Sequence, residues 1–404
     1  MACMQAADLA TVTPPPITLW RLFVRFLRFG CLAFGGPIAQ IGMLRTELVE
    51  RERWASPQHF LRALAVYQAL PGPEAHELCC WFGLLARGRR GALLAGLGFL
   101  LPGFCLMLLC ASLYTHYGMR SPWVASAFVG MQPAVIALVV LAVPRIGKHA
   151  LMHRIAWPAA IVGAISGLAD LPFALPLVFG ALWLSLAARG RLTQVLLLLT
   201  ASLAAAIFWP ADNGITTAAS AATLVPIVQP TFWSLLWLGL QAGLLTFGGA
   251  YTAIPFVRDG AVVKHQWLSD AQFLDGLAIG GVLPAPLLIF GTFTGHVAFG
   301  LPGALAMTLG IFAPAFSFTL IGHTFIERAM HAKRLQASLS GIAAVVTGLI
   351  AATAVRLCWQ HVAPQLFSAS VFCVALAIAL RWRSAWVVPV IVALAAITGI
   401  ALNS

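Results

Sequence analysis

Titratable side chains are scarce in this sequence, so those within apolar stretches are the first candidates for chemistry. Glu74, His76 and Glu77 directly follow the motif Pro71-Gly72-Pro73 in an apolar segment. The two glutamates are three residues apart and would share a helix face. Poorly solvated acids of this kind are usually functional, and we expect one of the three side chains to carry a coupling proton. The alternative is that the glutamates are N-terminal acids at the aqueous end of a helix.

Other chemistry-bearing residues give weaker signals. His296, between Thr292 and Thr294 and a following apolar run, would line a pathway or be a satisfied buried histidine. Eight cysteines contain no CxxC pair, and Cys79-Cys80 are neighbours in an apolar stretch. They indicate neither a disulfide framework nor a metal site, and no cofactor is expected.

Glycine and proline interrupt two apolar segments in each half of the chain. Phe34-Gly35-Gly36-Pro37 and Pro71-Gly72-Pro73 occur in the first half. Proline removes a helical hydrogen bond, and such breaks persist at membrane depth only where protein, water or a ligand satisfies the freed amides. A helix that begins at a break directs unpaired N–H groups and a positive dipole end toward an anion. The alternative is a simple kink for helix packing.

The sequence is duplicated. Phe247-Gly248-Gly249 lies 213 positions after Phe34-Gly35-Gly36. The same offset relates other pairs: Gly30 and Gly243, Arg45 and Arg258, Trp54 and Trp267, Phe60 and Phe273, Leu64 and Leu277, Pro71 and Pro284, Pro73 and Pro286. The second-half counterpart of the acidic motif, Ala285-Pro286-Leu287-Leu288, carries no charge. A constant register over this length indicates two homologous repeats.

Composition places the chain in a membrane. Hydrophobic residues make up 61% of 404 and charged residues 9%, against about 25% charged in soluble domains. The formal charge of +12 comes from basic residues in short gaps between apolar runs, which is typical of polytopic membrane proteins and not of nucleic-acid binding. The first membrane segment is expected to remain as an anchor, because the N-terminus lacks a signal-peptide pattern.

We predict an all-α polytopic protein with about ten to thirteen membrane segments, because ~20 residues are needed to cross. Candidate segments are 17–44, 59–86, 91–116, 122–144, 155–170, 172–188, 193–209, 228–256, 273–299, 303–326, 338–360, 366–380 and 385–402. The predicted units are a first repeat over 1–191, a connecting segment with an external loop over 192–222, and a second repeat over 223–404.

Basic residues predict that the repeats have opposite orientations. In the first half they follow the second, fourth and sixth segments, and in the second half the third and fifth. Segment 193–209 would be the crossing that inverts the second repeat. The loop over 45–62 disagrees, because it falls outside yet carries four arginines. Either that loop is an exception, or the first two segments do not each cross fully.

Arg45 and Arg258 lie nine residues after the second glycine of each motif, about 13 Å along a helix. They would attract an anion at the two entrances, or be ordinary interfacial arginines. Trp54 and Trp267 are expected to be interface anchors.

At these residues the sequence resembles the chromate ion transporter family. The resemblance rests on FGGP, LVERERW and ALPGP in the first half and on FGGAY, QWLS and the proline pair in the second. It covers nearly the whole chain. Ala285 stands where the family more often has glycine, and PGPEAHEL is more acidic than usual, which leaves the substrate open. The resemblance implies two opposed halves in a bacterial inner membrane and chromate export driven by the proton motive force, with sulfate as the usual competitor.

We therefore expect a secondary transporter of an oxyanion, chromate first, that works by alternating access. The repeats would rock around a site built from Gly35, Gly36, Pro37, Gly72, Pro73, Gly248 and Gly249. Phe34, Phe247, Pro71, Pro284 and Pro286 complete the structural motifs. The expected partners are the oxyanion and the lipid bilayer, with a homodimer left open. The alternatives are inward movement of sulfate or another oxyanion, a membrane-embedded detoxifying enzyme and an accessory subunit. The sequence has no phosphate-binding loop, GxGxxG, CxxCH or HExxH motif.

Overall fold

The computed structural model describes residues 14–118, 121–187, 229–247, 249–330, 333–382, 384 and 386–403. Within these ranges every regular element is a helix, which confirms the all-α prediction. The predicted segment 193–209, the loop after it and Gly248 lie outside the described residues.

The first half forms ten described helices: α2 (Leu19–Cys31), α3 (Gly36–Leu44), η1 (Arg45–Arg51), α4 (Pro57–Ala69), α5 (Glu74–Leu113), η2 (Tyr114–Gly118), α6 (Pro122–Ala150), η3 (Arg154–Ala156), α7 (Trp157–Leu168) and α8 (Ala174–Ala187). Here η marks 3₁₀- and π-helices.

The second half repeats this order: α10 (Phe232–Leu244), η4 (Ala250–Ala253), α11 (Ile254–Arg258), η5 (Asp259–Lys264), α12 (Asp270–Val282), η6 (Leu287–Ile289), α13 (Phe290–Met330), α14 (Lys333–Leu357), η7 (Cys358–Val362), α15 (Leu366–Arg381) and α16 (Val387–Asn403). Helices α10 and α12 begin and end 213 residues after α2 and α4. The sequence repeat is therefore also a repeat of secondary structure.

The longest helix of each half is folded back on itself. In α5 the turn is at Arg87 and Gly88, and Gly88 has φ 60° and ψ −154°. A Cβ on Gly83 would lie 2.3 Å from the carbonyl oxygen of Gly91. These residues would be about 12 Å apart in a straight helix, so α5 consists of two antiparallel limbs. Helix α13 turns the same way at Gly300, with φ 58° and ψ −151°.

The segments that precede the fold-back turn of α5 form two helical hairpins. The open ends of both hairpins lie beside that turn. Helix α2 and the α3–η1 pair are the limbs of the first hairpin. Arg25 of α2 forms an ion pair with Glu52, just past η1, and lies 5.3 Å from the centre of the Trp54 ring. Trp54 in turn contacts Phe82 near the end of the first limb of α5. The open end of this hairpin therefore lies beside the fold-back turn of α5.

Helix α4 and the first limb of α5 form the second hairpin. Phe60 stacks on Phe82, and His59 meets Trp81 edge-on, so the start of α4 lies beside the end of that limb. In the second half, Gly276 approaches Phe293 while Gly280 approaches Phe290, which is the same antiparallel pairing of α12 with the start of α13. The four interrupted segments are thus helical hairpins.

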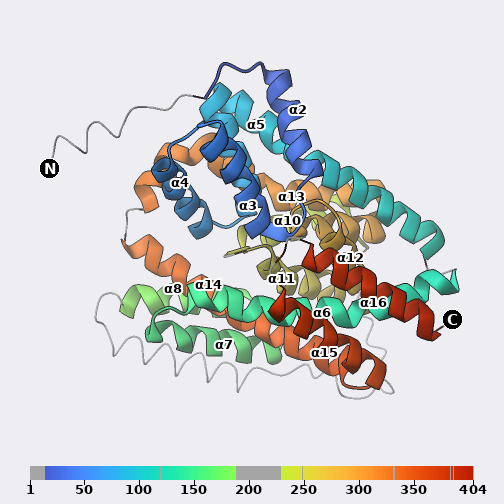
Figure 1. Cartoon of the computed structure of the whole chain (residues 1–404). Coiled ribbons are helices and arrows are strands. Elements are labelled where there is room, and N and C mark those ends of the chain that lie inside the picture. Colours follow the sequence, from blue (N-terminus) through green and yellow to red (C-terminus); the bar gives the residue numbers. More distant parts are fainter. Residues whose placement is uncertain are drawn as a thin grey trace.

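The two halves are interlocked (Figure 1). Helices α7 and α8 pack on α14 of the second half, whereas α15 and α16 pack on α6 of the first. Helices α2–α5 pack with α10–α13 in a separate layer, in which α5 and α13 are in direct contact. Each layer therefore contains the corresponding parts of both halves.

Corresponding limbs of α5 and α13 run in opposite directions. His76, in the first limb of α5, contacts Phe312 and Phe316 in the second limb of α13. Ser112, at the end of the second limb of α5, bonds to His296, close to the turn of α13 at Gly300. Because Ser112 lies at the end of its limb far from Gly88, the fold-back turns of α5 and α13 lie at opposite ends of the pair.

Four helices within the described ranges are long and apolar enough to cross a membrane: Glu74–Tyr117, Pro122–Ala150, Leu287–Leu320 and Leu335–Val362. Because α5 is folded back, its crossing part is the limb after Gly88. The predicted segments 17–44 and 59–86 are hairpins and not continuous spans. This arrangement accounts for the arginines over 45–62, since that loop lies at the same end as the basic turn Arg87–Arg90.

The hairpins predict which positions are reached from one face of the membrane. In a cysteine-free background, Gln58→Cys and Arg89→Cys should both react with an impermeant maleimide added to the same side, because both residues are exposed at the open end of the second hairpin. Labelling of the two positions from opposite sides would show that α4 and the first limb of α5 together cross the bilayer.

Candidate oxyanion site

The tips of hairpins from both halves meet in the middle of the molecule. The backbone N–H of Gly72, at one tip of the first half, donates to the carbonyl of Thr246 at 2.9 Å. The Gln40 side chain donates to the carbonyls of Ala33 at 2.8 Å and Ala285 at 3.1 Å. Thr246 and Ala285 belong to the two tips of the second half. We call this meeting of residues 32–36, 70–73, 245–247, 249 and 283–286 the tip junction.

The glycines at the tip junction adopt backbone conformations that other residues avoid. Gly35, Gly36, Gly72 and Gly249 have φ of 86°, 78°, 147° and 123°. A Cβ on Gly36 or Gly249 would meet no atom within 4 Å. These two glycines therefore satisfy a backbone requirement and leave open space beside the chain. Four of the five predicted site glycines are described, and they lie at the junction.

The second limb of each hairpin begins at the junction. Gly35 precedes α3, in which Pro37 occupies the first turn, and Pro73 precedes α5. Pro286 precedes η6, which leads into α13. Proline is compatible with a first turn because the N–H it lacks would be unpaired there. Limbs that begin at the junction direct positive dipole ends and free amides into it, as an anion site requires.

The predicted proton-carrying residues lie at the edge of this junction. Glu77 is fully buried, and neither carboxylate oxygen has a partner among the described residues. A Cβ on Gly72 would lie 2.7 Å from Glu77 Oε1. His76 is also fully buried, with Nδ1 3.9 Å from Cys80 Sγ, whereas Glu74 is only partly buried. Glu77 therefore places its carboxylate against the tip backbone at Gly72.

The two equivalent arginines have different surroundings. The side chain of Arg45 is 53% exposed and pairs with Glu50 at 3.0 Å. The side chain of Arg258 is 7% exposed and binds Asp270 through two hydrogen bonds of 2.7 and 2.9 Å. Both arginines are therefore paired with a carboxylate, but the Arg45 pair is open to solvent whereas Arg258 is buried.

The other predicted residues serve mainly in packing. Trp54 is fully buried, and Trp267 stacks on His265 at 4.6 Å. Phe34 stacks on Trp386, and Phe247 is buried. Trp54 thus packs within the protein.

The three candidates near the start of α13 are also bonded. His296 Nε2 lies 3.1 Å from Ser112 Oγ. The hydroxyls of Thr292 and Thr308 bond at 2.7 Å, and Thr294 donates to the Phe290 carbonyl. These polar groups link helix limbs and lie apart from the tip junction.

Sequence reasoning missed one buried acid. Asp275 of α12 is 2% exposed and accepts hydrogen bonds from Tyr114 and Gln132. The available signal was a single acid in the middle of an apolar segment, without a charged neighbour in sequence. Its equivalent at the repeat offset is Arg62, which is exposed.

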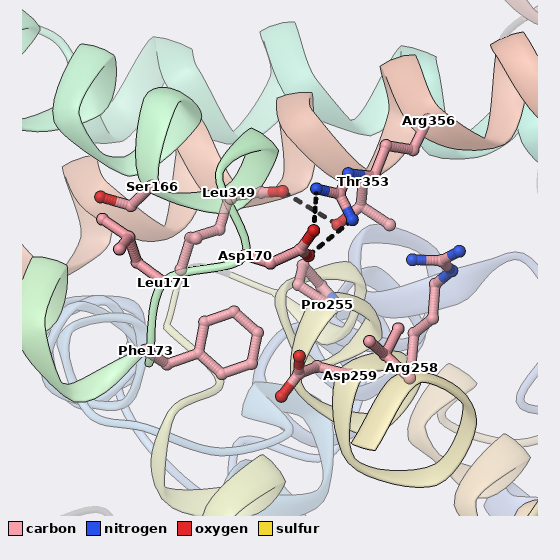
Figure 2. Close-up of a pocket in the computed structure, with 12 residues that line it drawn as sticks. Ser166, Asp170, Leu171, Phe173, Pro255, Arg258, Asp259, Leu349, Thr353 and Arg356 are labelled. Carbon is pink, nitrogen blue, oxygen red and sulfur yellow. Dashed lines mark hydrogen bonds and ion pairs between the residues drawn. The ribbon is translucent and has the colours of Figure 1, made fainter. Parts of the chain in front are cut away.

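A small cavity of about 30 Å³ lies away from the tip junction (Figure 2). In it, Arg356 of α14 binds Asp170 through hydrogen bonds of 2.6 and 2.7 Å. Arg258 and Asp259 of the second half lie opposite. The cavity has room for one or two water molecules. The Arg356–Asp170 pair joins the two halves within the layer of α6–α8 and α14–α16.

Comparisons with known proteins agree with the arrangement of the halves. The family model for the chromate transporter matches residues 20–225 and 233–400. The chain belongs to the chromate transporter family. It is 47% identical to a chromate transport protein of Pseudomonas aeruginosa, over 98% of this chain and 95% of that protein.

Two other relatives show the range of this family. A chromate transport protein of Cupriavidus metallidurans is 29% identical over 96% of this chain and 94% of its own. A transporter of Bacillus subtilis, described as uncharacterized, is 28% identical over 35% of this chain and 78% of its own length. No solved structure matches the chain. As a member of this family with long apolar helices, the protein is a multi-pass membrane protein.

The two equivalent arginines should respond differently to substitution. Arg258→Ala removes a buried cation and leaves the partly buried Asp270 unpaired, which should destabilise the protein by about 3 kcal/mol, the low end for a buried pair. Arg45→Ala breaks an exposed pair and should cost less than about 1 kcal/mol. Thermal unfolding in detergent measures both. If Arg45→Ala instead unfolds at a temperature as low as Arg258→Ala does, the two pairs are equally structural and this assignment is wrong.

Proposed function

We propose that this protein exports chromate from the cytoplasm across a bacterial inner membrane, driven by the proton motive force. The proposal is supported by the family match over residues 20–225 and 233–400 and by a junction of four helix breaks, because the first amides of a helix that begins there have no partner within the helix. Chromate is a tetrahedral dianion without hydrogen-bond donors. Backbone N–H groups and dipole ends suit it, because they bind an oxyanion without the fixed cations that would slow its release.

The membrane potential favours this direction. Moving one charge is worth about 2.3 kcal/mol per 100 mV, so a dianion leaving a negative interior gains about 4.6 kcal/mol. Uptake would have to overcome the same field. Export therefore needs no nucleotide hydrolysis.

We propose that the two halves are inserted with opposite orientations. The antiparallel contacts of α5 with α13 support this arrangement, because a second limb that crosses outward in one half then crosses inward in the other. The basic turn Arg87–Arg90 would face the cytoplasm, whereas its equivalent, Phe299-Gly300-Leu301-Pro302, carries no charge. In the labelling experiment above, Val263→Cys and Phe299→Cys should then react from the face opposite to Gln58→Cys.

Alternating access would occur between layers and not between repeats. Each half places its last three helices against the other half, so the repeats cannot separate as rigid bodies. The layer of hairpins, α2–α5 with α10–α13, can instead move against the layer of α6–α8 and α14–α16. The tip junction would then open to one side of the membrane at a time.

Glu77 would couple the anion to a proton. An ionised Glu77 next to Gly72 would repel a dianion at the junction, so the protein should bind chromate when this carboxyl is protonated. One proton leaving with the dianion leaves one net negative charge, so the membrane potential still drives export by about 2.3 kcal/mol per 100 mV, whereas the proton itself leaves against the pH gradient and lowers the net driving force.

Oxyanion flux in proteoliposomes tests the function. Purified protein should carry chromate toward the positive side of an imposed potential, and more slowly when the potential is removed. Parallel measurements with sulfate identify the preferred ion. Faster flux of sulfate than of chromate, or no flux of either, would contradict chromate export.

The Glu77→Gln variant tests the coupling. Wild-type chromate binding should strengthen as the pH falls, because protonation removes a negative charge from the junction. The variant should bind with little pH dependence, and the ratio of variant to wild-type affinity at each pH cancels the protonation of chromate itself. Glu47→Gln, a surface substitution on η1, is the control. An unchanged pH dependence in both Glu77→Gln and Glu74→Gln would exclude these acids as the coupling site.

A further inference from the structure

A second buried carboxylate lies in the hairpin layer, away from the tip junction. Asp275 occupies the second turn of α12 and is 2% exposed. Its Oδ2 accepts a hydrogen bond of 2.8 Å from the Tyr114 hydroxyl, and its Oδ1 accepts one of 3.0 Å from Gln132 Nε2. The ring of Phe293 meets that of Tyr114 edge-on, and Phe128 meets it from another side. The acid therefore sits in an apolar cage with two neutral donors.

No described cation pairs with Asp275. The elements packed against α12 are α5, α6, α13, α16 and η6. The titratable groups nearest the site are Tyr114 itself and His116, both in η2 directly after α5, and His296 on α13. Helices α16 and η6 contain no titratable group. On α12, Asp270 is occupied by Arg258. The basic residues of α6 begin at Arg145, 13 residues beyond Gln132, or ~20 Å along the helix.

The hydrogen bonds of Asp275 can survive a change in its protonation state. A tyrosine hydroxyl both donates and accepts. When the carboxylate is ionised, Tyr114 donates to it; when Asp275 is protonated, the acid can donate to the Tyr114 oxygen while Gln132 still donates to the other carboxyl oxygen. A Lys or Arg partner would hold the acid in its ionised form, but these two partners accommodate both forms.

The three residues also connect the halves. Asp275 belongs to the second half, whereas Tyr114 and Gln132 belong to the first. Any movement that separates α12 from the end of α5 or from α6 would break these bonds and change the solvation of the acid. The charge of Asp275 is therefore linked to the relative position of these helices.

We propose that Asp275, held by Tyr114 and Gln132, is a second proton-binding site of the transport cycle, which exchanges its proton with the side of the membrane opposite to that reached by Glu77. Glu77 lies one turn from Cys80, which contacts Gly96. Tyr114, directly after the second limb of α5, lies 18 residues beyond Gly96, or ~27 Å along a helix. The two acids thus occupy different depths, in hairpins of different halves. This inference rests on the proposed function.

The test uses full-length protein in right-side-out and inverted membrane vesicles, with the pH varied on one side at a time. Wild-type net chromate flux should respond to the pH of either side. Asp275→Asn can keep both hydrogen bonds, so it should retain chromate–chromate exchange. Its net flux should fall at least tenfold and lose its response to the pH on the periplasmic side. The response to the pH on the cytoplasmic side should remain. Tyr114→Phe removes a bond from both forms of Asp275, but the bond to the ionised form is the stronger because it is charge-assisted. The variant should therefore shift the profile against periplasmic pH to higher pH without abolishing it.

The outcomes separate the two proposals. If wild-type vesicles show no chromate exchange, the proposed function fails. If exchange occurs and Asp275→Asn keeps the wild-type response to periplasmic pH, only the second proton site is overturned. If Asp275→Asn loses exchange, the Tyr114→Phe profile decides, because an unshifted profile in that active variant also overturns the site. Glu47→Gln is the matched surface control and should follow the wild type throughout.

Discussion

The structure depends on how unpaired backbone amides are satisfied away from water. Four helical hairpins end inside the molecule, and each tip leaves N–H and C=O groups that lipid cannot bond. The tips satisfy part of this need with one another: Gly72 donates to Thr246, and Gln40 bridges Ala33 and Ala285. Those bonds join the two halves. In the proposed function, the amides that remain at the start of the second limbs bind the anion, so one requirement would shape both the fold and the site.

Small residues make this arrangement possible. The tight turn of each long helix brings Gly83 against Gly91 and Gly295 against Gly303, where a side chain would collide with backbone. Helix α2 approaches α5 in the same way at Gly30, and α10 approaches α13 at Gly243. In a membrane, where the hydrophobic effect does not drive helices together, close backbone packing of this kind supplies much of the association energy.

Duplication has given the protein two similar halves with different charges. Glu77 has an uncharged counterpart in the second half, Asp275 corresponds to an exposed arginine, and the exposed Arg45 corresponds to the buried Arg258. The backbone symmetry supports a site that either side can reach in turn. The unequal charges allow the two sides to differ in how they handle protons and anions.

The sequence by itself determined the membrane class, the repeat and the position of each helix break, because these follow from composition and from glycine and proline spacing. It also identified Gly35, Gly36, Gly72 and Gly249 as positions of helix breaks, and in the structure each of them has a positive φ. It could not distinguish a kinked span from a hairpin, because both have the same apolar length and the same glycines. Only the tertiary contacts of Arg25 with Glu52 and of Phe60 with Phe82 decided that the chain returns. Asp275 was missed for a related reason: its partners lie 143 and 161 residues away in sequence and are brought to it only by packing between the halves.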